Sequence, residues 1–450
     1  MRPRSITGPL ILLTIGVFFL INNLRPDLIS LSRIGDYWPF LLIAAGVIGL
    51  IEVLFHASRG ATAPPRPFYG AGIFWILVMG LVIATVSRNH NLRIGRFDSP
   101  GVSFFGSDFD YDINLSESNA TQSSQGVTRV VLDNLRGNLS LKGENVGDIK
   151  VTGRKTVRAF NRTDADHANQ QTQVHIERQG DSLLIRTEDA TGARLIQITT
   201  DLDITIPRGV SVESRGRTGD LTIDDIDGPV DVASGRGDVR LNQIGKDVKI
   251  EASRSGDIHV TDVKGSFDLE GRGGDVQLEN IAGPVTVNGE FGGTIEFRAL
   301  AKPMRFNSSR TDFHVEAVPG SITMDLGNLR LQNVSGPVRF RTGTRDIQAT
   351  DVSGALDLTI DRGDVTVTVG KTPVPKIDVH TRNGEITLAL PEKAEFQLDG
   401  STSQGDVDNE FGGGLQTQSN GRAATIKGHI GNGPLVTVGS DRGMISVKKS

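Results

Sequence analysis

The chain repeats one phrase four times between residues 217 and 278: Arg217-Thr-Gly-Asp-Leu-Thr-Ile223, Arg236-Gly-Asp-Val-Arg-Leu241, Arg254-Ser-Gly-Asp-Ile-His-Val260 and Arg272-Gly-Gly-Asp-Val-Gln-Leu278. In each copy a Gly-Asp pair precedes two apolar residues that one polar residue separates. Successive pairs are 18 or 19 residues apart. Self-similarity at such a short, nearly fixed period is typical of repeat architectures.

Each copy continues with one isolated apolar residue and then a second apolar pair. The isolated residues are Ile226, Ile244, Val263 and Ile281, and the second pairs begin at Val230, Val248, Phe267 and Val285. This period-two alternation predicts short, half-buried strands. Stacking two-stranded coils about 4.8 Å apart pairs their backbones and buries their apolar rows. The sequence therefore predicts an all-β repeat fold, a parallel, β-helix-like solenoid with coils of about 18–21 residues.

Composition agrees with this fold and excludes several kinds of partner and site. The 450 residues include 54 glycines and only 5% aromatic residues, which suits many tight turns and thin cores. A formal net charge of −5 does not favour a nucleic-acid partner. The absence of cysteine excludes disulfides and thiolate metal sites. The oligomeric state is left open by the sequence.

The N-terminal region, residues 1–87, has the composition of a membrane anchor. Three stretches of 19 residues, 6–24, 37–55 and 68–86, carry almost no charge. A helix of that length spans a hydrocarbon core of roughly 30 Å. No small-residue cleavage site follows the first stretch, so we expect three retained transmembrane helices and not a signal peptide.

Charge flanking these stretches gives a slight topological preference. With the N-terminus inside, Arg2, Arg4, Arg59 and Arg66 lie on the cytoplasmic side. Three spans then place the rest of the chain outside the cytoplasm. We expect a multi-pass protein of a bacterial inner membrane, with the lipid bilayer as one partner.

The remaining chain divides into a tether and a repeat domain. Residues 88–126 are polar, and residues 127–448 carry the alternation, with a non-repeating N-terminal cap and leading strands at 127–216 and repeats at 217–448. Within the cap, residues 162–173 predict a short polar helix across the start of the sheet. The repeat pattern blurs between residues 299 and 341 and then returns to the C-terminus.

Stacked turns predict two rows of charge, which are the candidate site residues. Rows of like charge repel, so we expect the arginine row to offset the aspartate row; the alternative is that the rows bind an anionic or polyhydroxylated envelope polymer. The row residues are Arg217, Asp220, Arg236, Asp238, Arg254, Asp257, Arg272, Asp275, Arg362 and Asp364.

Other interpretations of these motifs are weaker. The tripeptide Arg-Gly-Asp at 236–238 and 362–364 matches an adhesion motif, but both copies fit the repeat turn. Calcium-binding β-rolls need a nine-residue period and a third glycine that Arg272-Gly-Gly-Asp275 lacks. The histidines are scattered, and no catalytic or metal-ligand spacing emerges. We therefore expect no enzyme activity, metal or cofactor.

Two segments resemble known bacterial families. Leu202-Asp-Ile-Thr-Ile-Pro-Arg-Gly-Val-Ser-Val-Glu-Ser214, followed by the first repeat, resembles the "putative adhesin" β-repeat family, also called toastrack domains, over roughly residues 127–448. Gly8–Leu24 and Trp38–Val47 resemble the membrane hairpin of the LiaI/LiaF envelope-stress proteins. The resemblance implies an extracytoplasmic β domain on the inner membrane, and it supplies no catalytic residues. This chain departs from the pattern by its third apolar stretch and its long repeat array.

Together these features favour a non-enzymatic, membrane-anchored envelope protein that displays a β-solenoid for envelope-stress sensing or scaffolding. Other envelope membrane proteins or an envelope polymer are the expected partners. One alternative is a surface adhesin or polysaccharide-binding module. A second alternative is a glycan-degrading β-helix enzyme, which requires converging acids outside the regular rows.

Overall fold

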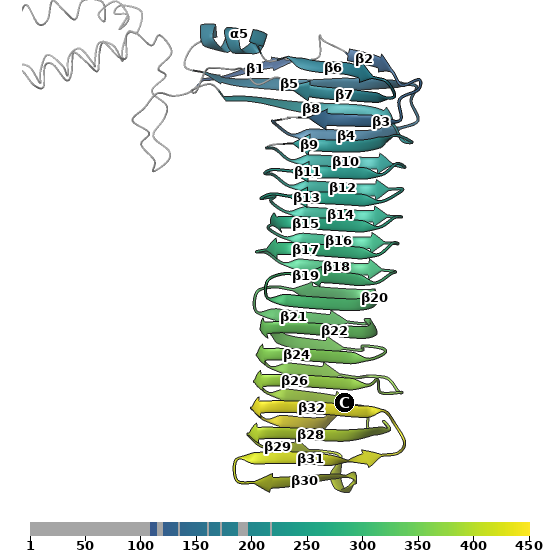
Figure 1. Ribbon diagram of the computed structural model, residues 1–450, viewed down its shortest axis with the longest axis vertical. Coiled ribbons are helices and arrows are strands. Elements are labelled where there is room, and N and C mark those ends of the chain that lie inside the picture. The colour runs from purple at the N-terminus through teal and green to yellow at the C-terminus, as the bar shows by residue number, and fades with distance from the viewer. Residues whose placement is uncertain are drawn as a thin grey trace, which may run out of the picture. The chain divides into compact units, whose positions relative to one another are not determined.

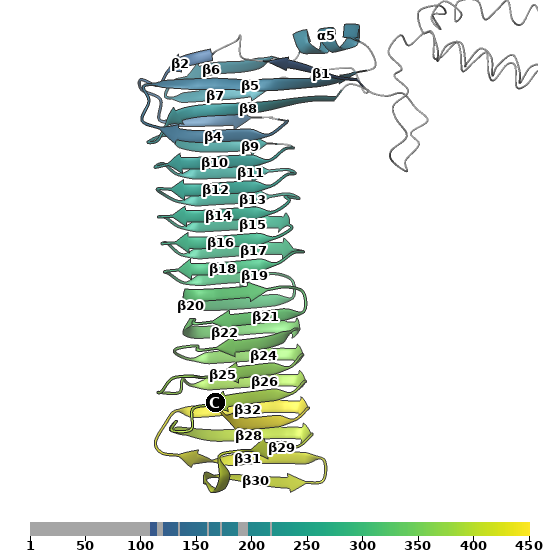
Figure 2. The same cartoon turned by 180° about the vertical axis from the view of Figure 1, so that it is seen from behind.

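A computed structural model describes residues 109–114, 120–133, 136–159, 162–171, 173–187, 197–216 and 218–450. These residues belong to one compact unit, Asp108–Ser450. Figures 1 and 2 show this unit as a column of stacked coils. The predicted membrane helices 6–24, 37–55 and 68–86 and most of the tether lie outside the described residues. Among the residues that are described, no helix combines the length and hydrophobicity needed to cross a membrane.

The strands form two sheets, and most neighbouring strands within a sheet are parallel. Toward the N-terminal end, sheet A contains β1 (Phe109–Asn114) and β2 (Ala120–Ser123), both paired with β5 (Asp148–Ala159). It continues, in spatial order, through β8 (Gln197–Pro207), β4 (Leu139–Glu144), β10 (Leu221–Ile226), β12 (Val239–Ile244), β14 (Ile258–Val263), β16 (Val276–Ile281), β18 (Ile295–Leu300), part of β20 (Thr311–Met324), β21 (Asn328–Gln332), β23 (Asp346–Thr350), β25 (Val365–Thr368), β27 (Ile386–Leu390), β33 (Ile445–Lys449) and β29 (Val407–Asn409).

Sheet B supplies the other strand of each coil. Its spatial order is β6 (Val174–Gln179), β7 (Ser182–Thr187), β3 (Arg129–Asp133), β9 (Ser211–Gly216), β11 (Val230–Ser234), β13 (Val248–Ala252), β15 (Phe267–Gly273), β17 (Val285–Phe291), β19 (Met304–Asn307), the rest of β20, β22 (Ser335–Thr344), β24 (Leu356–Arg362), β26 (Ile377–Asn383), β32 (Leu435–Arg442), β28 (Phe396–Gln404), β31 (Ala423–Ile430) and β30 (Leu415–Asn420). A short 3-10 turn, η2 (Gly412–Gly414), precedes β30.

Alternating side chains from both sheets point into one continuous core. In the coil of β11 and β12, the buried apolar residues are Val230, Val232, Val239, Leu241 and Ile244. Each such side chain contributes about 1.5–3 kcal/mol on burial. The all-β solenoid predicted from the alternation is confirmed, and its strands are mostly, but not uniformly, parallel.

A left-handed backbone residue explains the isolated apolar position of each repeat. The residue before Ile226 is Asp225, with φ of 62°, and the residue before Ile244 is Gln243, with φ of 56°. This conformation bends the end of the sheet A strand, so the next side chain turns inward, and Ile226 and Ile244 are fully buried. The same conformation recurs at Asp262, Asn280, Ala299, Asn333 and Asp351.

The repeats blur between residues 299 and 341 because the chain reverses there. Strand β20 runs antiparallel to β19 and β22 in sheet B, and antiparallel to β18 and β21 in sheet A. One coil of the column therefore runs backward, which a uniformly parallel prediction misses. Larger side chains fill this coil; Phe313 and Phe340 meet edge to face, with ring centroids 5.1 Å apart.

Both ends of the solenoid are interleaved. Strand β3 lies between β7 and β9, and β4 lies between β8 and β10. At the other end, β32 lies between β26 and β28, and β33 lies between β27 and β29. The last strands in sequence are therefore interior strands of the sheets.

The helix predicted at residues 162–173 is confirmed as α5 (Arg162–Gln171). It packs on sheet A through Ala165 and Ala168, which meet Val157 and Ile198. Lys155 donates to the backbone carbonyl of Asn169 at 3.1 Å, and burial lowers the pKa of this lysine. The helix thus covers part of the non-repeating cap.

Candidate functional site

The predicted charge rows lie at one corner of consecutive coils. Asp220, Asp238, Asp257 and Asp275 immediately precede β10, β12, β14 and β16, and Asp364 precedes β25. Arg236 and Arg254 lie two and three residues before their aspartates, where the chain passes from sheet B to sheet A. Arg272 lies near the end of β15, and Arg362 ends β24. Arg217 lies outside the described residues.

The aspartates form a continuous ladder of hydrogen bonds along the column. Asp238 donates its backbone N–H to Asp220 Oδ1 at 2.9 Å, Asp257 donates to Asp238 Oδ1 at 3.0 Å, and Asp275 donates to Asp257 Oδ1 at 3.0 Å. Each carboxylate therefore satisfies the corner N–H of the next coil. Where the backbone turns at the corner, these N–H groups lack a carbonyl acceptor in a neighbouring strand, and the aspartate oxygen takes the place of that acceptor.

The ladder extends into the cap and ends at a threonine. Asn138 N–H donates to Asp201 Oδ1 at 2.7 Å, and Asp220 N–H donates to Asn138 Oδ1 at 3.1 Å. At the other end, Thr294 N–H donates to Asp275 Oδ1 at 2.7 Å. An asparagine can thus occupy a rung, so the shared property of the row is an oxygen acceptor and not a negative charge.

A second ladder runs beyond the reversed coil. Asp364 N–H donates to Asp346 Oδ1 at 2.9 Å, and Glu385 N–H donates to Asp364 Oδ1 at 2.8 Å.

Hydroxyl groups from sheet B, which the sequence analysis did not identify, add hydrogen bonds at the same corner. Thr402 donates to the carbonyl of Gly443 at 2.9 Å, and Ser440 donates to the carbonyl of Gly384 at 3.0 Å.

The arginine row does not pair with the aspartate row. Arg236, Arg254, Arg272 and Arg362 are exposed, and within the described ranges no ion pair of 4.0 Å or less joins any of them to a ladder aspartate. Backbone N–H groups supply the favourable interaction instead. Hydrogen bonding from the Asp257 amide holds the pKa of Asp238 below its ordinary value, and Arg240, at 2.7 Å, adds to this effect.

Glycine is required at the corner by conformation and by space. Gly237 has φ of 121°, and a Cβ built there lies 2.1 Å from the carbonyl oxygen of Gly219. Gly363 has φ of 140°, and its Cβ would lie 1.9 Å from the carbonyl oxygen of Arg345. The glycine of each Arg-Gly-Asp copy is thus packed against the preceding coil, and the Asp238 and Asp364 carboxylates already accept hydrogen bonds. This geometry favours the repeat-turn interpretation over an adhesion loop.

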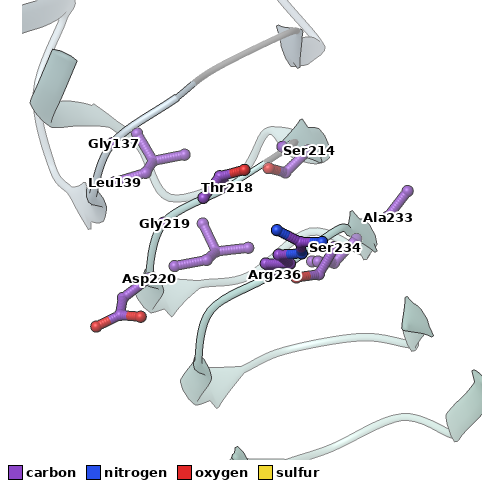
Figure 3. Close-up of a pocket in the computed structure, with 12 residues that line it drawn as sticks. Gly137, Leu139, Ser214, Thr218, Gly219, Asp220, Ala233, Ser234 and Arg236 are labelled. Carbon is purple, nitrogen blue, oxygen red and sulfur yellow. The ribbon is translucent and has the colours of Figure 1, made fainter. Parts of the chain in front are cut away.

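A pocket at this corner is too small for an organic ligand. It has a volume of about 20 Å³ and lies between Ser214, Gly219, Ser234 and Arg236. Figure 3 shows the Asp220 carboxylate pointing away from Ser234 and Arg236. A space of this size holds about one water molecule. In the part of the chain that the structure describes, no group of three or more acidic or histidine side chains is placed to hold a metal ion.

A larger groove lies on the outer face of sheet B at the reversed coil, and the sequence analysis did not identify it. Its volume is about 380 Å³, and its lining includes Pro284, Pro303, Arg305, Asp312, His314 and Arg339. Arg305 lies opposite His314 across β19 and β20, and His314 lies opposite Arg339 across β20 and β22. Only the reversal brings these three residues into one row, so no spacing in the sequence indicates the groove.

Two solved structures and one protein family are similar to this chain. The chain is similar over 76% of its length to the crystal structure of a "putative cell adhesion protein" from Clostridium sporogenes, covering 100% of that chain at 9% identity and a TM-score of 0.15. It is similar over the same share to a "putative adhesin" from Bacteroides fragilis, covering 97% of that chain at 10% identity and a TM-score of 0.16. TM-scores this low add nothing to the description of the fold. Among curated proteins no match is found.

Family membership rests on the repeat domain itself. The profile of the family described as Toastrack DUF4097 matches residues 138–448, a range that begins just before β4 and ends within β33. It includes the whole acceptor ladder from Asn138 to Thr294 and the reversed coil. This match extends over more than half of the sequence, and the chain belongs to the toastrack family DUF4097.

Proposed function

We propose that this chain is a non-enzymatic protein of the bacterial envelope that anchors in the inner membrane through residues 1–87 and displays its solenoid outside the cytoplasm. The solenoid then acts as a scaffold or sensor in the response to envelope stress. The observation that carries the proposal is the pairing of three apolar 19-residue stretches, which carry almost no charge, with a toastrack solenoid on one chain.

The chemistry of the corners supports a scaffold. The ladder carboxylates accept backbone hydrogen bonds in succession, so they hold coils in register and are not free to act as a converging acid pair. A regular rod of this kind presents side chains at fixed spacing to a partner. The bilayer and other envelope membrane proteins are the partners that this proposal requires.

Topology is the experiment that tests the proposal. A protease site and a reporter domain fused after Ser450 are expected to be accessible from outside the inner membrane in spheroplasts. Deletion of residues 1–87 is expected to release the chain from the membrane fraction and abolish its role in the stress response. A C-terminus protected inside the cytoplasm contradicts the proposal.

A surface adhesin or polymer-binding module is the second candidate, and the groove at the reversed coil favours it. The two candidates differ in where binding resides. An adhesin binds polymer or cells through the solenoid even when residues 1–87 are deleted, whereas an envelope-stress component loses its role with that deletion.

A further inference from the structure

The reversed coil builds a row of three successive basic residues, two arginines and a histidine, that recurs nowhere else along the described part of sheet B. In this row Arg305, His314 and Arg339 occupy three successive strands on the outer face. Directly opposite residues in an antiparallel pair have Cβ atoms about 4.5–5.5 Å apart. Thr286 continues the row on one side, and Asp357 continues it on the other.

The row lies in a groove of ligand size. Its volume of about 380 Å³ falls within the range of small-molecule sites, about 300–1,000 Å³. Pro284 and Pro303 form one side, and Asp312 lies on the other. Pro284 and Pro303 belong to the connections that precede β17 and β19, so the groove begins at a corner of the coils and continues onto the outer face of sheet B.

The two arginines of the groove differ in their pairing. Arg339 pairs with Asp357 at 3.3 Å, but both side chains are substantially exposed. Arg305 forms no ion pair of 4.0 Å or less among the residues with a described structure. With the Asn307 amide turned so that its nitrogen faces Asp312, Asn307 donates to Asp312 Oδ1 at 2.9 Å and accepts from Arg305 Nε at 3.1 Å. The amide thus lies between Arg305 and Asp312 and contacts the guanidinium through Nε, not through its terminal nitrogens.

These groups select a particular ligand chemistry. Planar guanidinium groups match carboxylate oxygens in a bidentate manner. Asp312 disfavours a phosphate dianion, whereas a sugar hydroxyl can donate to it. The last Trp in the sequence is Trp75 and the last Tyr is Tyr111, so residues 112–450, which include the whole groove, offer no indole or phenol ring on which a neutral sugar stacks. Recognition therefore depends on charge.

We propose that this groove binds a carboxylated saccharide, with the sugar carboxylate on Arg305 and Arg339 and a hydroxyl donating to Asp312. This inference does not depend on the membrane attachment proposed above. It assigns a ligand to the solenoid, and it makes His314 and Thr286 the adjacent polar contacts for the sugar ring.

Calorimetric titration of the full-length chain tests the assignment. The probes are trigalacturonate, a hyaluronan hexasaccharide, fully methyl-esterified trigalacturonate and inorganic phosphate. We expect at least one of the two carboxylated saccharides to bind, the ester not to bind, and phosphate not to compete. Binding is expected to weaken as salt rises, because the groove is exposed.

Two arginine variants localise the binding. Arg305→Gln is expected to weaken it about tenfold or more, since a charge-assisted bidentate contact is lost and no ion pair of the folded protein is broken. Arg330→Gln removes the same charge from an exposed residue on sheet A of the neighbouring strand β21, and it is expected to bind like the unaltered chain. Circular dichroism confirms that both variants are folded.

Several results overturn the assignment. Failure of both carboxylated saccharides to bind does so, and so does equal binding of the esterified sugar. Competition by phosphate indicates a phosphate-bearing polymer instead. Equal losses in the two variants show that binding is a diffuse charge effect. None of these outcomes bears on the topology experiment, so failure of this inference and failure of the proposed function are distinguishable.

Discussion

Replacing Asp238 by alanine removes one rung of the acceptor ladder. The Asp257 N–H, which donates to Asp238 Oδ1 at 3.0 Å in a part-buried corner, loses its partner. Leaving a buried donor unpaired costs about 1–3 kcal/mol. The Asp238 side chain is 29% exposed, so water compensates in part and the expected loss is about 1–2 kcal/mol. The exposed ion pair with Arg240 adds at most about 1 kcal/mol.

The matched control is Asp238→Asn, which keeps an oxygen acceptor at the same position. An asparagine already occupies one position of this ladder, because Asn138 Oδ1 accepts from the Asp220 N–H at 3.1 Å. A neutral hydrogen bond is roughly half as strong as a charge-assisted one, so the asparagine variant is expected to lose about half as much stability as the alanine variant.

Urea unfolding of the full-length chain, followed by far-ultraviolet circular dichroism, measures both losses. A shift of the midpoint at constant slope reports the change in the free energy of unfolding. The reasoning is refuted if the alanine variant is as stable as the unaltered protein. It is also refuted if asparagine is as damaging as alanine, since that result makes the charge, and not the acceptor, the property that matters.

Three further predictions concern the corner, the C-terminal end and pH. Ala299→Asn is expected to raise the free energy of unfolding by about 0.5–1 kcal/mol in the same urea assay, because Ala299 is exposed with φ of 50° and asparagine tolerates this conformation; an unchanged midpoint contradicts the assigned conformation. Truncation after Pro434 removes β32 and β33, which are interior strands of the two sheets, so limited proteolysis is expected to cleave residues 396–430 readily. Resistance of residues 396–430 to the protease shows that β32 and β33 are dispensable. Hydrogen bonds from the backbone and hydroxyl of Ser266 hold the pKa of Asp247 below its ordinary value. The ionised Asp247 side chain therefore stabilises the folded protein fully above its unfolded pKa of about 4, and this stabilisation is lost as pH falls through the lower folded pKa. The free energy of unfolding of the unaltered chain is therefore expected to exceed that of Asp247→Asn by less and less as pH falls from 5 to 2. A difference that stays constant over this pH range contradicts the lowered pKa of Asp247.

Local alternation predicts the strands well because it reports burial directly. In Val239-Arg-Leu241 the two apolar residues are buried and the arginine between them is exposed, as the period of two requires. The left-handed residue near the end of each sheet A strand is harder to predict, because several residue types occupy this position. Asp225 and Asn280 are favourable there, but Gln243 and Ala299 give no signal of their own.

Strand order at the ends and in the middle depends on non-local pairing. Ile386–Leu390 and Ile445–Lys449 carry the same kind of alternation as any repeat, yet they are neighbours in sheet A although Ile386 and Ile445 are 59 positions apart in the sequence. Nothing in either segment specifies the other as its partner. The groove has the same origin, since Arg305 and His314 become adjacent only when β20 reverses.

Hydrogen exchange at the corner amides tests the role of the Gly-Asp repeats most directly. If the aspartate row is an acceptor ladder, the amides of Asp238, Asp257, Asp275 and Thr294 exchange as slowly as those of the strands that follow them. Exchange of these amides at the rate of an open surface loop, beside protected strands, means that the carboxylates do not hold the corners and that the repeated aspartates serve another purpose.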